Sequence, residues 1–141
     1  MGTVIHFFVS GIPAPQGSKR HVGNGRMIES SKKLKPWRAE VKRVAELIAE
    51  IGEPLDCPLR VSMDFYLPRP KRSKFKDHPA GKPDADKLAR AVNDALTDSG
   101  LIADDSRIVS LHVRKHWTDD TPGASITVEP LWERLHASLG R

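Results

Sequence analysis

The sequence predicts an α+β fold (mixed α/β), with two helices packed on a mixed sheet of about four strands. Two segments, 36–51 and 84–99, repeat apolar residues at helical spacing, and a glycine follows each of them. The order of the elements along the chain suits helices layered on one sheet. The segments that are rich in β-forming residues are 3–10, 59–67, 107–117 and 124–129.

Length and composition limit the class of protein. At 141 residues the chain is long enough for one domain, which we expect to span 1–141, and too short for two. Charged residues make up 29% and hydrophobic residues 38%, as in folded globular proteins. No apolar run reaches membrane-spanning length, so no membrane partner is expected. The first fifteen residues lack the pattern of a secretory signal.

The chain has a single cysteine, Cys57. One cysteine excludes an internal disulfide and a cysteine-based zinc site. The expected compartment is therefore a reducing cytoplasm. We expect Cys57 to be a small, half-buried residue at the entry to a strand.

Basic and acidic side chains are divided along the chain, whose net charge is +5. Residues 1–82 carry sixteen basic and eight acidic side chains, whereas residues 83–141 carry seven and ten. This division suits a protein that grips phosphates with one part and places a metal with another. A solvated charged surface is the alternative.

Residues 3–10 are predicted to form an internal strand, because apolar side chains occupy most of both faces. His6 interrupts one of these faces. We expect His6 to be a packed core residue rather than a ligand.

Residues 11–28 contain two prolines and four glycines, a composition typical of loops and turns. The sequence Gly-Asn-Gly at 23–25 is suited to closing a small hairpin. The segment is then a basic arm that embraces nucleic acid, or else a solvated loop. The expected DNA-binding side chains on this arm are Lys19, Arg20 and Arg26.

The first helix is predicted to begin near Pro36, a favourable residue in a first turn. Trp37 and Val41 belong to its apolar stripe, and we expect Trp37 in the core. The lysines at and before its start oppose the helix dipole, and a bound phosphate would relieve that cost.

Residues 59–67 give the clearest strand, with every second residue apolar. A segment with five basic residues in nine, 68–76, follows, and its prolines exclude a central strand. A flexible basic segment just before a cluster of acids is well placed to hold a phosphate backbone, although a plain surface loop is the alternative. The expected DNA-binding residues here are Arg69, Lys71, Arg72 and Lys74.

Two pairs of aspartates bracket the second helix: Asp84 and Asp86 before it, Asp104 and Asp105 after it. We expect the helix to bring the two pairs together at one end of the sheet. Carboxylates held close repel one another unless a cation neutralises them, and carboxylate oxygens suit Mg²⁺ or Mn²⁺. The alternative is structural, with the first pair capping the helix and the second solvating a turn.

Residues 107–117 and 124–129 are predicted to form an antiparallel hairpin. The segment between them, 118–123, is a turn in which Asp119 and Asp120 are expected to serve turn chemistry rather than metal binding. Residues 130–141 are expected to be a C-terminal tail or a short helix.

The acidic stretch resembles the signature of the RusA family of Holliday-junction resolvases (crossover junction endodeoxyribonucleases). That signature runs D-x-D-N-x-x-K, then D-A-L, then D-D before a strand; here it is DADKLAR at 84–90, DAL at 94–96 and the pair at 104–105. Two positions differ, because Lys87 replaces the usual Asn and Arg90 the usual catalytic Lys. The metal ligands that the resemblance implies are Asp84, Asp86 and Asp105, with Asp104 in a supporting role.

The resemblance also implies a RusA-like fold and a metal-dependent enzyme, using Mg²⁺ or Mn²⁺, that nicks branched DNA by hydrolysis. Its implied partners are a Holliday junction and a second copy of the chain, in a homodimer with two active sites. Such an enzyme would act in recombination, repair or phage DNA processing, in a bacterial or phage-infected cytoplasm. Arg90 or Lys82 would offset charge on the phosphate, and Lys87 would lie beside the DNA.

Two other functions remain open at this point. Lys87 and Arg90 are compatible with a branched-DNA-binding module whose site is inactive, because an ammonium group can neutralise the acids in place of a metal. A metal phosphohydrolase of small substrates is the third possibility, although the basic arm argues against it.

Overall fold

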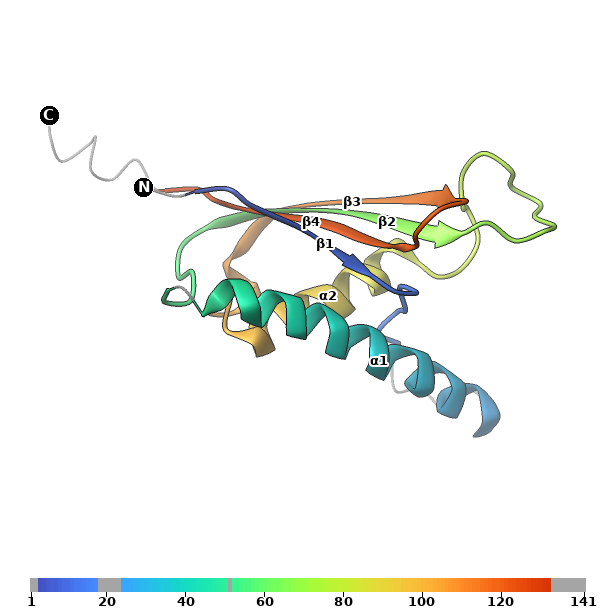
Figure 1. The fold of residues 1–141 in the computed structure, drawn as a ribbon, viewed down its shortest axis with the longest axis horizontal. Helices are drawn as coiled ribbons and strands as arrows, with labels where there is room; N and C mark the ends of the chain where they lie inside the picture. The colour runs from blue at the N-terminus through green and yellow to red at the C-terminus, as the bar shows by residue number, and fades with distance from the viewer. Residues whose placement is uncertain (1–2, 18–23, 51, 133–141) are drawn as a thin grey trace, which may run out of the picture.

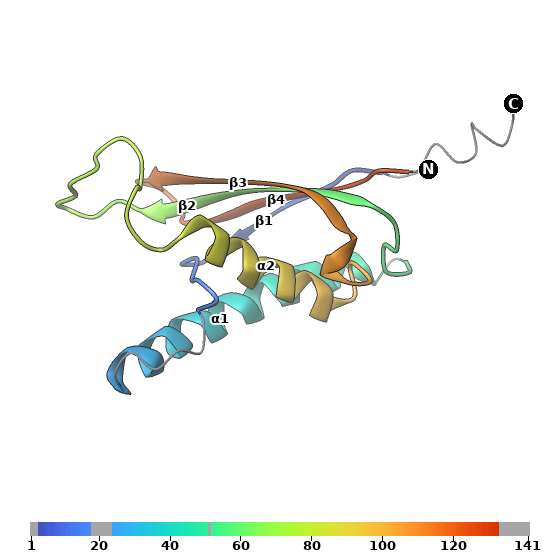
Figure 2. The same cartoon turned by 180° about the vertical axis from the view of Figure 1, so that it is seen from behind.

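The computed structural model describes residues 3–17, 24–50 and 52–132, with the backbone alone from 24 to 31. The sequence-based α+β prediction is confirmed, because two helices pack on one four-stranded mixed sheet. Both helices cover the same face of the sheet, and the described residues leave the other face open (Figures 1 and 2). The elements are β1 (Ile5–Ser10), α1 (Asn24–Ala49), β2 (Leu59–Pro68), α2 (Ala85–Ser99), the 3₁₀ turn η1 (Asp105–Arg107), β3 (Ile108–Thr118) and β4 (Gly123–Pro130).

The strands lie in the order β1-β4-β2-β3. β2 pairs in parallel with β3 and antiparallel with β4, so the predicted hairpin of β3 with β4 is wrong. The physical reason is the apolar content of β2, in which every second residue from Leu59 to Leu67 is buried. A strand of this kind gains most from neighbours on both edges, and β2 takes the position between β3 and β4.

β1 is an edge strand, so its predicted internal position is also wrong. Phe7 and Val9 face the core, whereas His6 and Phe8 are exposed on the open face. His6 is not a core residue; its Nδ1 lies 2.7 Å from the Thr127 hydroxyl across the strand pair. The apolar residues on the outer face of β1 therefore include a partly exposed aromatic ring, that of Phe8, and do not mean that the strand is buried on both faces.

α1 begins at Asn24, well before the predicted start near Pro36, which lies inside the helix. The predicted hairpin is wrong over 24–28, which are helical, and residues 18–23 lie outside the described part of the chain. Between Arg26 and Lys35 no glycine or proline stops the helix from extending backwards. The lysines before Pro36 consequently lie inside the helix, and the argument about a lysine-rich first turn does not apply.

The core lies between the helices and the sheet. Trp37 and Val41 of α1 are buried, as predicted, and so are Leu88 and Leu96 of α2. Cys57 is buried just before β2, and burial raises the pKa of its thiol. Among the described residues, no helix is long and apolar enough to cross a membrane.

Candidate functional site

The first acid pair lies at the start of α2, as the sequence predicts. Asp84 takes the N-cap position with an extended backbone, φ −71° and ψ 140°, but its side chain makes no capping hydrogen bond. Its backbone carbonyl accepts the Leu88 amide at 3.0 Å. Asp86 is exposed in the first turn. The Asp84 carboxylate is therefore not used for capping, and both carboxylates are accessible to a ligand.

Basic side chains from the same helix lie beside this pair. The Lys87 Nζ is 3.7 Å from the Asp84 Oδ2, and both side chains are about half exposed. An exposed pair at this distance is weak and readily exchanged. Arg90 lies four residues after Asp86, on the same side of the helix, and is also exposed.

Lys115 is a neighbour of the site that sequence reasoning missed. From β3, its Nζ donates to the carbonyl oxygens of Gly81 at 2.8 Å and Pro83 at 2.9 Å. These bonds hold the segment that leads into Asp84. Lys115 pairs with the buried Phe65 across the strands and so lies on the helix-facing side. A lysine among apolar residues on that side of a strand is the signal that would have revealed it.

A second anchor comes from the N-terminal segment. The Gln16 amide donates to the Lys87 carbonyl at 3.0 Å, and the Gln16 side-chain oxygen accepts from Arg38 of α1 at 3.2 Å. The first turn of α2 is thereby joined both to the segment after β1 and to α1.

The basic loop after β2 projects beyond the end of the sheet that lies near the start of α2 (Figure 1). Arg69 is engaged within the protein, donating to Asp119 at 3.0 Å and to the Lys76 carbonyl at 2.8 Å. Asp119 is thus an ion-pair partner, beyond the turn chemistry expected of it. The Trp117 indole donates to the Phe75 carbonyl at 3.0 Å. The basic loop residues that are exposed and have no ion pair within the described residues are Lys71, Arg72, Lys74 and Lys76.

The second acid pair lies at the other end of α2. Asp104 caps the 3₁₀ turn, with its Oδ2 accepting the Ser106 amide at 2.9 Å. Hydrogen bonding from the side chain and the backbone of Ser106 lowers the pKa of Asp104. Asp105 is exposed at the start of the turn. Nearby, Arg107 donates to Asp56 at 2.6 Å, which ties this turn to the segment before β2.

The two pairs do not meet within one chain, so the expected convergence is wrong. α2 has 15 residues, and at 1.5 Å per residue it separates its two ends by about 22 Å. The cause is topological: a helix that joins two parallel neighbouring strands must carry the chain from the end of the first strand back to the start of the second, at the opposite end of the sheet (Figure 2). The described residues contain no group of three or more His, Cys, Asp or Glu side chains placed to hold a metal ion.

The remaining DNA-binding predictions are only partly described. Lys82 is exposed two residues before Asp84. Lys19 and Arg20 lie outside the described residues, and Arg26 falls on α1, where only the backbone is described.

Cations gathered around solvent-facing carboxylates, on a small α+β fold, are typical of proteins that bind nucleic-acid phosphates and do chemistry on them. Comparison with known protein families matches residues 10–129 to the family described as Endodeoxyribonuclease RusA. Because the match covers most of the chain, the protein belongs to the RusA endodeoxyribonuclease family. Membership implies nuclease activity on branched DNA, of which the Holliday junction is the type substrate. No curated protein matches the chain.

Proposed function

We propose that the protein is a divalent-metal-dependent endonuclease that nicks Holliday junctions or related branched DNA during recombination, repair or phage DNA processing. We place this activity in a bacterial or phage-infected cytoplasm. The observation that carries the proposal is the acid pair at the start of α2. It lies inside the family match, and the Asp84 carboxylate is not used for capping.

Asp84 and Asp86 are the residues that would hold Mg²⁺ or Mn²⁺. Two carboxylates, completed by waters and substrate phosphate, are a common ligand set for Mg²⁺. When bound, such an ion lowers the pKa of a water and offsets charge on the phosphodiester. Lys87 balances the Asp84 charge at 3.7 Å in this structure. Once the carboxylate is engaged elsewhere, the Lys87 ammonium is released toward the phosphate.

Arg90 and Lys82 would contact the phosphate beside the acid pair, one from the exposed side of α2 and the other from the segment before it. A guanidinium donates two parallel hydrogen bonds to phosphate oxygens, whereas an ammonium acts as a compact point charge. Lys115 is a positioning residue in this scheme, because it binds the carbonyls of Gly81 and Pro83 and so holds the entry to Asp84.

Asp105 would complete the site from a second copy of the chain. Since about 22 Å of helix separates it from Asp84 in one chain, it cannot share that chain's ion. β3 offers a surface for the second copy, because it is an edge strand of 11 residues with Val109 65% and Leu111 44% exposed. Two β3 edges laid antiparallel bring the start of one strand beside the end of the other, so Asp105 of each copy approaches the acid pair of its partner. A two-fold homodimer then has two equivalent sites, one for each of two opposed strands of a four-armed junction.

The first test is Asp86→Asn on a synthetic four-way junction with Mg²⁺. We expect nicking to be lost and junction binding in metal-free buffer to be kept, because the amide removes a metal ligand without disturbing the basic surface. Nicking by the variant at the wild-type rate would contradict the metal assignment.

A subunit-mixing experiment tests the shared site. Asp86→Asn and Asp105→Asn should each be inactive alone, whereas random mixing of equal amounts should restore about a quarter of the wild-type sites, because half of the dimers carry one intact site. Sites built within one chain would give no recovery on mixing. That result would overturn the shared site and leave the nuclease assignment standing.

A binding module with an inactive site is the second candidate. The Lys87–Asp84 pair favours it, since the ammonium already neutralises one of the two acids. Junction binding by the wild-type protein, without nicking in Mg²⁺ or Mn²⁺, would support this candidate over the nuclease.

A further inference from the structure

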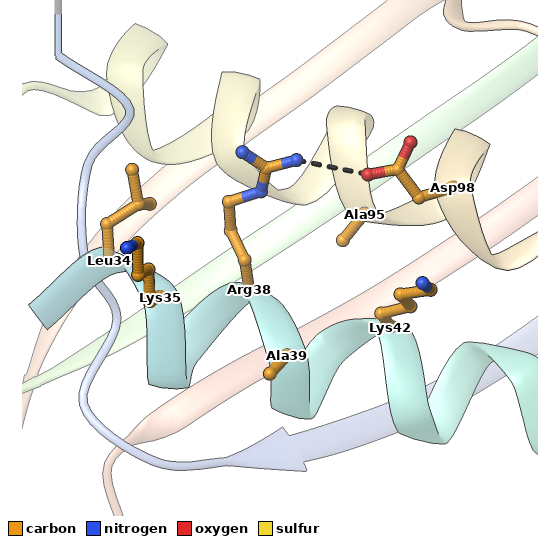
Figure 3. Close-up of a pocket in the computed structure, with 7 residues that line it drawn as sticks. All are labelled: Leu34, Lys35, Arg38, Ala39, Lys42, Ala95 and Asp98. Carbon is orange, nitrogen blue, oxygen red and sulfur yellow. Dashed lines mark hydrogen bonds and ion pairs between the residues drawn. The ribbon is translucent and has the colours of Figure 1, made fainter. Parts of the chain in front are cut away.

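An open groove of about 320 Å³ runs between α1 and α2, on the side of the helices away from the sheet core (Figure 3). Its base is apolar and its sides are charged. α1 supplies most of the lining, and α2 supplies one alanine and one aspartate. The lining residues are Leu34, Lys35, Arg38, Ala39, Lys42, Ala95 and Asp98.

Three cations follow one another along the α1 side of the groove, against the single carboxylate of Asp98. Lys35 is exposed and has no ion pair within the described residues. Lys42 is only loosely paired, with its Nζ 4.0 Å from Glu46. The groove therefore carries an uncompensated positive charge that a polyanion would neutralise.

Arg38 is fixed in the middle of this row. Its guanidinium donates to Asp98 at 3.0 Å and to Gln16 at 3.2 Å. A guanidinium has five N–H donors, and these two bonds use only two of them. Asp98 and Gln16 thus hold the plane of Arg38 in place, and within the described part of the chain its other donors remain for an incoming anion.

We propose that this groove binds the phosphodiester backbone of a DNA strand, as a second contact site away from the acid pair. Seven residues of helix separate Lys35 from Lys42, a rise of about 10 Å along the axis. One strand of B-DNA carries a phosphate about every 3.4 Å along its axis, so the row of three cations is about as long as three steps between consecutive phosphates.

Gln16 makes the groove continuous with the candidate nuclease site. Its backbone amide binds the carbonyl of Lys87 in the first turn of α2, and its side chain binds Arg38. One residue therefore spans from the acid pair to the centre of the groove. The assignment of DNA as the occupant rests on the proposed function, whereas the positive charge of the groove does not.

The test is the salt dependence of junction binding, measured by fluorescence anisotropy in metal-free buffer so that no strand is cut. Each phosphate contact contributes about 0.9 to the slope of log K against log salt concentration. Lys35→Ala with Lys42→Ala should lower that slope by nearly two contacts and weaken binding. Lys33→Ala is the matched control: it removes an exposed lysine of the same helix, on the side away from the groove, and should leave the slope unchanged.

A double variant with the slope of the wild-type protein would overturn the groove assignment. So would a loss in Lys33→Ala half as large as in the double variant, because an equal loss for each lysine removed reports net charge alone. Neither result bears on nicking by the wild-type protein, which decides the proposed function separately. Circular dichroism of each variant excludes misfolding as the cause of a changed slope.

Discussion

Asp64 shows how one carboxylate organises the open face of the sheet. Its Oδ1 accepts a hydrogen bond from the Arg114 Nε at 2.8 Å, and the His116 Nε2 lies 2.7 Å from the same oxygen. The His116 ring stacks on Tyr66 with centroids 5.0 Å apart. Hydrogen bonding from Arg114 is the main cause that lowers the pKa of Asp64, and hydrogen bonding from His116 adds to it. The charged form of Asp64 therefore stabilises the fold by joining β2 to the edge strand β3.

This arrangement predicts a pH-dependent contribution to stability. Because the pKa of Asp64 is lower in the folded state than its ordinary value of 3.8, the contribution is present above that value and is lost as the pH falls through the folded pKa. Asp64→Asn should lower the free energy of unfolding at pH 7 by about 1 kcal/mol, and the difference should shrink below pH 4. Urea titrations at several pH values measure it. Asp77→Asn, at an exposed loop carboxylate, is the control variant.

At the scale of elements, the sequence predicts best the helices and strands whose ends carry clear local signals. α2 was predicted within a residue at each end, because its apolar stripe is flanked by Asp84 and by Gly100, whose φ of 82° gives a left-handed cap. The start of α1 was missed, because Pro36 was interpreted as a helix start although the sequence before it favours a helix. Strand order was also missed, since pairing depends on contacts between distant segments and not on local pattern.

The features of the candidate site also divide into local ones, which the sequence predicts, and ones that depend on how distant elements pack, which it does not. The acid pair at a helix start is a local feature, and the sequence placed it correctly. The expected convergence of the two pairs failed, because it depends on the direction of α2 relative to β2 and β3. Lys115 and the α1–α2 groove depend on packing between elements, and no motif in the sequence marks them.

Gly123 gives a prediction for the junction of β1 and β4. It opens β4 with a φ of 157°, and a Cβ there would overlap the Val9 carbonyl oxygen. Neither the backbone angle nor the space suits a larger residue. Gly123→Ala should lower the free energy of unfolding by about 3 kcal/mol. Gly52→Ala is the control for urea denaturation, because its Cβ would meet nothing within 4 Å.

At the scale of the whole molecule, the sheet has one covered face and two edges that differ. β1 is a short edge strand of 6 residues, whereas β3 is a long one of 11. The acid pairs lie at opposite ends of α2, in the layer beneath the sheet (Figure 2). The proposed dimer through β3 uses both features, since it would cover the long edge and bring the two kinds of acid together in each site.

The dimer proposal predicts that a charge on the β3 edge removes both assembly and activity. Leu111 is 44% exposed and shares the face of the buried Val61, so Leu111→Lys would place an ammonium group at the centre of the proposed interface. We expect a monomer by analytical ultracentrifugation and a loss of nicking by roughly a hundredfold or more, because a ligand from the second copy is then absent. Val4→Lys, at the exposed start of the opposite edge, should leave both unchanged. An active Leu111→Lys monomer would show that one chain holds a complete site, and Asp105 would then have no part in it.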